Sequence, residues 1–176
     1  MNLTNSDMKA IYPGTFDPIT NGHLDLIKRA RAIFPSLIVA VVEDNHLKNT
    51  MFSAPDRISM VKDAMNNFGL DVEVCGFSGL LIDFAKNTGA NVIVRGLRAF
   101  SDFEYEFQMS AINYRLESTI HTIFLPSRDD MHFISSRMIK NVFEIGGDIS
   151  SFVPANVEKK LKETNNHTPS QSKEQS

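Results

Sequence analysis

Short apolar stretches alternate along this chain with segments of helical character, and this alternation constrains the fold more than any other feature. The apolar stretches are Met8–Tyr12, Leu37–Val42, Val72–Val74, Val92–Val94 and Thr119–Leu125. The helical segments between them are Asn21–Phe34, Ser53–Phe68, Ser78–Asn87 and Asp102–Leu116. Strands that alternate with helices are typical of a parallel sheet covered by helices. The sequence therefore predicts a Rossmann-like α/β fold: one domain with a five-stranded parallel sheet flanked by helices.

The two ends of the chain differ in composition from the middle. The chain has 176 residues, which favours a single domain, and we expect that domain to cover residues 8–162. The polar segment Met1–Asp7 is expected to be a short extension, because it lacks the apolar region of a signal peptide. Pro154 can open a last short helix, and residues 163–176 contain no aliphatic or aromatic side chain. They are therefore predicted to form a disordered tail.

The composition argues against several classes of protein. Net charge is −3, with Lys and Arg scattered along the chain, so a nucleic-acid partner is not indicated. Leu37–Val42 is the longest plain apolar run and is too short to span a bilayer, so no membrane association is expected. Cys75 is the only cysteine, which excludes an internal disulfide and a cysteine-rich metal site. The sequence favours a cytoplasmic protein.

Polar, basic and glycine residues follow the predicted strands. Ligands of open parallel sheets bind outside the carboxyl ends of the strands, so these segments are expected to form the site. They are the loop YPGTFDPITNGH (Tyr12–His23), a loop that contains Lys48, the segment Arg95–Arg98, and PSRDDMHFISSRM (Pro126–Met138). Helices are expected to begin near Asn21 and at Ser135 or Ser136. Free backbone N–H groups and the helix dipole make such helix starts suitable for anions.

Several phosphates are the ligand that this edge of the sheet suits best. Lys48, Arg95 and Arg98 would add positive charge to the two helix starts. The chain contains neither G-x-G-x-x-G nor G-x-x-x-x-G-K-[ST], so neither the usual dinucleotide fingerprint nor a P-loop is present. Taken singly, each of these residues has a plainer reading as a turn glycine, a helix cap or a surface ion pair. Their convergence at strand ends favours a binding site.

Two short motifs carry a resemblance to a known superfamily. TNGH resembles the T/H-x-G-H signature of the nucleotidyltransferases, and ISSRMIK resembles their second motif, I-S-S-x-x-x-K. The longer strings YPGTFDPITNGH, RGLRAFSDFEYEFQ and FISS, in this order, resemble the bacterial phosphopantetheine adenylyltransferase family. The similarity runs from about Lys9 to Leu161.

This resemblance implies a reaction, a cofactor and an assembly. The family transfers the adenylyl group of ATP to 4′-phosphopantetheine, which gives dephospho-coenzyme A and pyrophosphate. This is the penultimate step of coenzyme A biosynthesis. The resemblance also implies Mg²⁺, which we expect to sit mainly on ATP phosphate oxygens, without an assigned protein ligand. A homohexamer is implied as well, and the aromatic-rich segment Phe100–Tyr114 could serve as an interface or as core.

The resemblance assigns roles residue by residue. His23 is implied to lie on the reacting phosphates, and our hypothesis is that it stabilises the transition state by donating to an α-phosphate oxygen and is not the base. The residues implied to bind the acceptor substrate are Thr15, Lys48, Leu81 and Arg95. The residues implied to bind ATP are Thr15, Phe16, His23, Gly96, Leu97, Arg98, Glu106, Met131, His132, Phe133, Ile134, Ser135, Ser136 and Arg137.

The sequence also departs from the family pattern and leaves alternatives open. Lys48-Asn49-Thr50 stands where the family usually has Lys-Lys-Pro, and Arg137 stands where a third serine is common. Related enzymes that act on nicotinamide mononucleotide, or that use CTP and a phosphorylated alcohol, are the nearest alternatives. A nucleotide-binding regulator without catalysis is an alternative from another class.

Overall fold

A five-stranded parallel sheet forms the centre of the molecule, as the sequence predicts. The computed structural model describes residues 8–44, 49–98 and 100–166. Within these ranges the strand order is β3-β2-β1-β4-β5, and every pair is parallel. The strands are β1 (Lys9–Gly14), β2 (Ser36–Val42), β3 (Glu73–Phe77), β4 (Val92–Leu97) and β5 (His121–Pro126).

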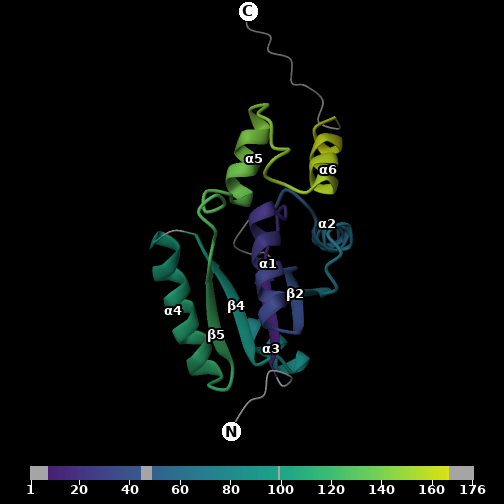
Figure 1. Cartoon of the computed structure of the whole chain (residues 1–176). Coiled ribbons are helices and arrows are strands. Elements are labelled where there is room, and N and C mark those ends of the chain that lie inside the picture. Colours follow the sequence, from purple (N-terminus) through teal and green to yellow (C-terminus); the bar gives the residue numbers. More distant parts are fainter. Residues whose placement is uncertain (1–7, 45–48, 99, 167–176) are drawn as a thin grey trace, which may run out of the picture.

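Helices connect these strands and extend beyond them. They are α1 (Asn21–Ile33), α2 (Ala54–Asn67), α3 (Leu81–Thr88), α4 (Phe100–Leu116), α5 (Ser136–Glu144) and α6 (Ala155–Asn166). The first four each lie between two consecutive strands, so every parallel crossover contains a helix. Figure 1 shows α5 and α6 beyond the carboxyl ends of the strands, at the end of the molecule opposite the N-terminus.

Alternate residues of the central strands pack into two separate cores. In β1, Ala10 and Tyr12 belong to a large core with α1 and α2, whereas Ile11 belongs to a smaller core with α3. Side chains of a strand point alternately to the two faces of the sheet, so helices cover both faces. The buried strands therefore read as continuous apolar runs rather than as alternating ones.

A serine and two glycines mark ends of α2 and α3. The Ser53 hydroxyl accepts from the Asp56 backbone N–H (3.3 Å) at the start of α2. Gly69 follows the end of α2 with φ +62°, and Gly89 caps α3 with φ +70°. Glycine is favoured at such left-handed positions because it has no Cβ.

The order of the strands places a crevice at the carboxyl end of β1. From β1 the chain proceeds through β2 to β3 on one side, and it then returns to pair β4 with the other side of β1. The helices that leave β1 and β4 therefore diverge, and ligands of such sheets bind at this switch point. The loop Tyr12–His23 and the segment Arg95–Arg98 both begin here.

The C-terminal helix is part of the main core. Val157 and Leu161 of α6 are fully buried. The helix runs to Asn166, so residues 163–166, which the sequence assigned to the tail, are helical. Residues 1–7 and 167–176 lie outside the described ranges, so the predictions for the extension and for the rest of the tail stay predictions. No helix among the described residues is long and apolar enough to cross a membrane.

Candidate active site

The loop that joins β1 to α1 has a tightly packed backbone. Phe16 has φ +49°, an uncommon conformation for a residue with a side chain, and its ring is 2% exposed. The ring meets those of Tyr12 and His23 edge-on, at centroid distances of 5.7 and 5.2 Å. A Cβ on Gly14 would lie 2.8 Å from the Phe16 ring. Glycine is therefore required at position 14 for the Phe16 ring to fold back beneath the loop.

His23 is fixed by a reciprocal cap at the start of α1. The Thr20 hydroxyl accepts from the His23 backbone N–H (3.3 Å), and the Thr20 backbone N–H donates to His23 Nδ1 (3.1 Å). This arrangement is a capping box in which an imidazole takes the place usually held by Glu or Gln. Because Nδ1 accepts a hydrogen bond, the proton of the neutral ring must be on Nε2.

The surroundings of His23 keep its ring neutral. Burial, together with the positive charges of Arg98 and Arg95, lowers the pKa of His23 from 6.5 to about 4. At neutral pH the ring therefore offers one N–H, on Nε2, and no lone pair there. Such a group donates a hydrogen bond to an anion but does not act as a proton acceptor at Nε2.

Arg95 and Glu106 form a two-pronged ion pair beside this loop. Arg95 Nε donates to Glu106 Oε2 (2.7 Å), and Nη2 donates to Oε1 of the same carboxylate. Arg95 Nη1 also donates to the Pro13 carbonyl (2.9 Å), which links β4 to β1. The carboxylate therefore fixes the plane of the guanidinium, because a paired fork has little rotational freedom.

A hollow of about 120 Å³ adjoins this ion pair. Its walls are formed by Leu81, Arg95, Tyr105, Glu106, Met109, Ser110, Asn113 and Thr122. The structure thus brings together Leu81 and Arg95, both assigned to the acceptor, with Glu106, which was assigned to ATP. Neither Met109 nor Asn113 was predicted from the sequence to belong to the site. Tyr105, Met109 and Asn113 are spaced by four residues along α4. This spacing places them on one face of the helix and is the signal that could have found them.

The segment Met131–Arg137 contacts the first loop. Ser136 Oγ donates to the Pro18 carbonyl (2.7 Å), and the Ile134 side chain lies 3.7 Å from where a Cβ on Gly22 would be. Ser135 caps α5 by accepting from the Met138 backbone N–H (3.2 Å). The start of α5 therefore lies next to the start of α1, so two helix N-termini meet at this edge.

For the other residues predicted to bind ligands, the structure gives their packing or exposure only. Gly96 packs against Leu26, since a Cβ at position 96 would lie 2.4 Å from a Leu26 methyl carbon. Arg98, His132, Phe133 and Arg137 are exposed, whereas Leu97 and Met131 are half-buried. Lys48 lies outside the described residues. The ligand contacts assigned to all these residues stay predictions.

Asp17 and Lys140 form an ion pair that was not predicted from the sequence. Lys140 Nζ donates to Asp17 Oδ2 (2.6 Å), and the same carboxylate accepts the backbone N–H groups of Met51 and Phe52 (3.0 Å each). Lys140 is the last residue of the I-S-S-x-x-x-K motif, which was the available signal. The pair ties α5 to the first loop and to the chain that follows the Lys48 segment.

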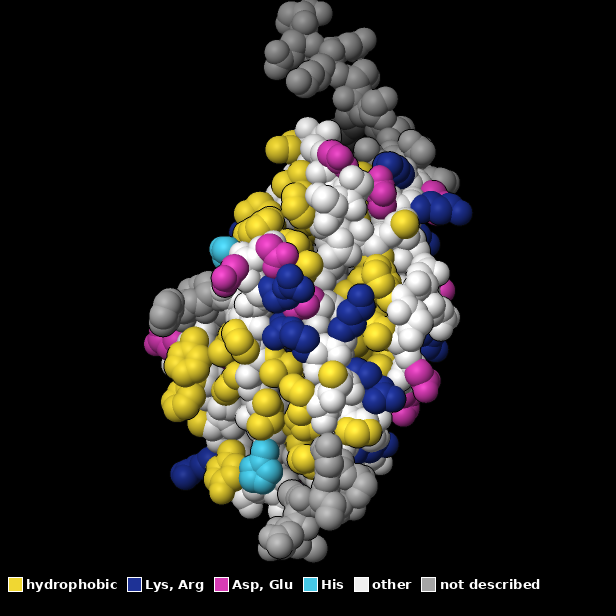
Figure 2. Space-filling view, viewed as in Figure 1, with side chains coloured by type: hydrophobic (Ala, Val, Ile, Leu, Met, Phe, Trp, Pro, Cys, Tyr) yellow, Lys and Arg dark blue, Asp and Glu magenta, His cyan; other side chains and the backbone are white. Residues whose placement is uncertain are grey.

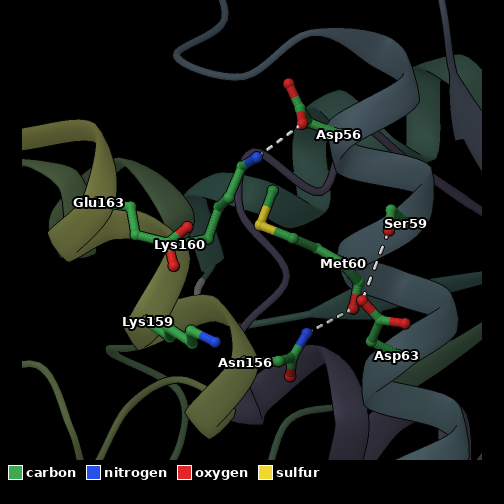
Figure 3. A pocket seen from close by; sticks show the side chains of 8 residues that line it. All are labelled: Asp56, Ser59, Met60, Asp63, Asn156, Lys159, Lys160 and Glu163. Carbon is green, nitrogen blue, oxygen red and sulfur yellow. Dashed lines mark hydrogen bonds and ion pairs between the residues drawn. The ribbon is translucent and has the colours of Figure 1, made fainter. Parts of the chain in front are cut away.

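A larger hollow, of about 300 Å³, lies between α2 and α6 and contains none of the predicted site residues. Figure 3 shows acidic and basic side chains facing one another across it, with Lys160 paired to Asp56 at 2.9 Å. Because the charges of this hollow are mixed and no predicted site residue lines it, we place the active site at the strand ends instead.

The lowered pKa of His23 predicts a pH-dependent stability. Between pH 4 and 6.5 the unfolded chain binds a proton at His23 that the folded chain does not bind. The free energy of unfolding should therefore fall as pH is lowered through this window, by about 2–3 kcal/mol in total. His23→Gln, whose amide can still accept from the Thr20 N–H, should lack this contribution.

Urea denaturation of wild type and His23→Gln at pH 7 and pH 4 measures how far the free energy of unfolding of each protein falls. An NMR titration of the imidazole measures its pKa directly. A midpoint near 6.5 would contradict the lowered pKa of the buried ring.

Comparisons with known proteins give the chain its family. The cytidylyltransferase-like family model matches residues 11–142. A phosphopantetheine adenylyltransferase from Wolbachia pipientis subsp. Culex pipiens (strain wPip) is 51% identical over 161 residues, which are 92% of this chain and 94% of the relative. The enzyme of the same name from Legionella pneumophila (strain Lens) is 46% identical over 166 residues, or 94% and 96% of the two chains.

A solved structure supports the fold. The crystal structure of a candidate nicotinate-nucleotide adenylyltransferase from Vibrio parahaemolyticus superposes with a TM-score of 0.63. It covers 88% of this chain and 99% of its own, at 20% sequence identity, which supports a shared fold and nothing finer. The matched motifs, the switch-point site and the two close relatives agree: this chain belongs to the cytidylyltransferase-like nucleotidyltransferases and, within them, to the phosphopantetheine adenylyltransferase family.

Proposed function

We propose that this protein transfers the adenylyl group of ATP to 4′-phosphopantetheine and releases dephospho-coenzyme A and pyrophosphate. This reaction is the penultimate step of coenzyme A biosynthesis. The observation that carries the proposal is the neutral imidazole of His23, held at the first turn of α1 with its donor on Nε2. The close relatives bear the name of this activity.

The attacking group in this reaction needs no strong base. A phosphate monoester has a second pKa of about 6, so it is largely dianionic at neutral pH. The obstacle is the repulsion between two anions and the charge that builds on the phosphates in transit. Positioning and electrostatic stabilisation therefore supply most of the rate, as in other phosphoryl-group transfers. A hydrogen-bond donor such as His23 Nε2–H suits this task, whereas a base would add little.

The ATP phosphates would lie where the starts of α1 and α5 meet. Backbone N–H groups of both helix starts, the Thr15 hydroxyl and the charge of Arg98 would surround them. The described residues contain no group of three or more His, Cys, Asp or Glu side chains placed to hold a metal. We propose that Mg²⁺ is bound mainly by ATP phosphate oxygens and water, because hard cations favour such oxygen ligands, and there it would neutralise phosphate charge. The cytoplasmic location expected from the sequence stays a prediction.

The acceptor would lie along the hollow beside Arg95. Its phosphate would meet the Arg95 guanidinium, and its pantetheine arm would follow the hollow past Leu81. Among the contacts of the described residues, Arg95 uses three of its five N–H groups, on Glu106 and Pro13. Nη1 and Nη2 each keep one N–H, which suits two oxygens of a phosphate. Glu106 would then act with the acceptor site by fixing the plane of Arg95.

Pyrophosphate release with ATP and 4′-phosphopantetheine tests the proposed function. Nicotinamide mononucleotide and a phosphorylated alcohol, each with ATP and with CTP, serve as the alternative substrate pairs. We expect release with the first pair at least a hundredfold faster than with the others. ATP binding without release with any pair would favour the regulator over the enzyme.

Replacement of His23 by Ala should reduce turnover more than binding. The backbone N–H groups at the start of α1 remain, so ATP should still bind. Loss of a donor that acts as charge develops typically lowers kcat by about 10²–10³. Single-turnover rates against pH, with folding checked by circular dichroism, measure the effect. A deficit that disappeared at high pH would instead indicate that His23 acts as a base.

Replacement of Arg95 by Lys should weaken binding of the acceptor more than binding of ATP. Lysine keeps the charge, but it cannot hold Glu106 and a phosphate with one planar fork. The loss of a charge-assisted hydrogen bond should cost about 1.5–3 kcal/mol in acceptor affinity. Calorimetric titration with each substrate separates the two affinities. A fall confined to ATP affinity would place Arg95 in the ATP site.

We also propose that the chain forms a homohexamer through exposed apolar side chains of α4 and β5. Large apolar side chains on α4 and β5 are exposed: Phe103, Tyr105, Phe107, Ile112, Tyr114, Leu116 and Ile123. Figure 2 shows hydrophobic side chains gathered over this side of the molecule. Exposed apolar side chains gathered in one region of a protein usually mark an interface.

Sedimentation equilibrium tests the assembly. Wild type should have six times the 19.7 kDa mass of one chain. Phe107→Asp should shift the protein towards smaller species, because a carboxylate would be buried in the interface. Ile145→Asp is the matched control, since Ile145 is exposed but lies at the end of α5. A wild-type monomer, or equal effects of both variants, would contradict the proposal.

A further inference from the structure

Arg57 is a buried charged residue that lies outside the catalytic motifs. It belongs to α2, is 1% exposed, and is among the largest fully buried side chains of the described residues. Its Nη1 donates to the Thr15 carbonyl and to the Val42 carbonyl (2.7 Å each), and its Nε donates to the Phe52 carbonyl (3.2 Å). The guanidinium therefore binds three backbone carbonyls, two of them where β1 and β2 end.

Two carboxylates lie near enough to stabilise this charge. Burial lowers the pKa of Arg57, and Asp17 and Glu43 oppose that effect. Asp17 in turn accepts the backbone N–H groups of Met51 and Phe52. The chain at Phe52 is thus held on both sides, its N–H by Asp17 and its carbonyl by Arg57.

The bond to Thr15 fixes the orientation of one peptide plane. A trans peptide is planar, so its carbonyl and its N–H point in opposite directions. The Thr15 carbonyl points to the buried guanidinium, and the N–H of the same peptide, which belongs to Phe16, therefore points away from it. Among the described residues no protein group accepts this N–H. The left-handed conformation of Phe16 also needs support, because such backbones persist only where the surroundings hold them.

We infer that Arg57 is a positioning residue, which holds the Thr15 carbonyl so that the Phe16 N–H faces the phosphates of bound nucleotide. Arg57 touches no substrate itself. It acts through one peptide plane, and through Val42 it keeps the ends of β1 and β2 at a fixed separation. The inference rests on the proposed function for its effect on turnover. Its effect on the peptide does not depend on the reaction.

Arg57→Lys is the test variant, and Arg57→Met is a second variant that removes the charge. An ammonium group cannot reach three carbonyls with the geometry of a planar guanidinium, so the Thr15 carbonyl should lose its fixed partner. Met65→Ala is the matched control, because Met65 is 2% exposed on the same helix and lies in the core. It should lower the melting temperature without moving the strand ends.

Turnover per folded molecule is the first measurement. We expect Arg57→Lys to lower kcat by about 10- to 100-fold, because small misplacements of a donor have effects of that size. The Kd for ATP should change by less than about threefold, since the other phosphate contacts remain. Met65→Ala should keep the wild-type kcat in its folded fraction. Equal kcat in Arg57→Lys and wild type would overturn the inference.

The Phe16 amide itself is the second measurement. Thr15–Phe16 is the only Thr–Phe pair in the sequence, so carbonyl-¹³C threonine with ¹⁵N phenylalanine selects a single amide signal. In wild type and Met65→Ala this signal should shift on addition of ATP. In Arg57→Lys and Arg57→Met the Phe16 amide signal should have a different chemical shift before ATP is added, and the shift should change less on addition of ATP. An unchanged position and response in both Arg57 variants would overturn the inference even if kcat fell.

The two measurements separate this inference from the proposed function. If wild type released no pyrophosphate with any substrate pair, the proposed function would fail. The ATP response of the Phe16 amide would then decide the role of Arg57 alone.

Discussion

The reciprocal cap between Thr20 and His23 is the interaction on which the site depends. One imidazole nitrogen satisfies the backbone at the start of α1, and this leaves the proton on the other nitrogen. Helix initiation and the tautomer of the ring are therefore fixed by the same hydrogen bond. Because burial, together with the positive charges of Arg98 and Arg95, lowers the pKa of the ring to about 4, the ring is neutral at physiological pH and carries its one proton on Nε2. The same imidazole ring thus caps α1 through Nδ1 and presents a hydrogen-bond donor through Nε2.

Around this cap, buried and half-buried charges hold the strand-end loops together. Arg57 binds carbonyls, Asp17 binds backbone N–H groups and Lys140, and Arg95 binds Glu106. Buried charges are costly unless they are paired and hydrogen-bonded, and each of these has partners. They are accordingly weak evidence for stability. Their value is that they bind segments distant in the sequence at fixed positions, which a preorganised site requires.

Much of the fold could be predicted because periodicity and glycine placement are local signals. The strand–helix alternation gave all five strands, and the stop at Gly69 follows from a left-handed backbone that only glycine adopts easily. The site edge was also predictable, since ligands of parallel sheets bind at strand ends. By contrast, Arg57, Asp17 and Lys140 carry no local signature of their partners. Arg57 and Thr15 are far apart in sequence, and only packing brings them together.

By itself the sequence determined the α/β class, the family and the identity of the residues at the strand ends, since motifs and periodicity depend on near neighbours. It did not determine which groups those residues meet. The tertiary structure decided that Glu106 lies with Arg95, that His23 Nδ1 is occupied, and that α6 is part of the main core. Hydrogen bonds and pKa shifts depend on three-dimensional distance and burial, and these are set only when the strands pair and the helices pack.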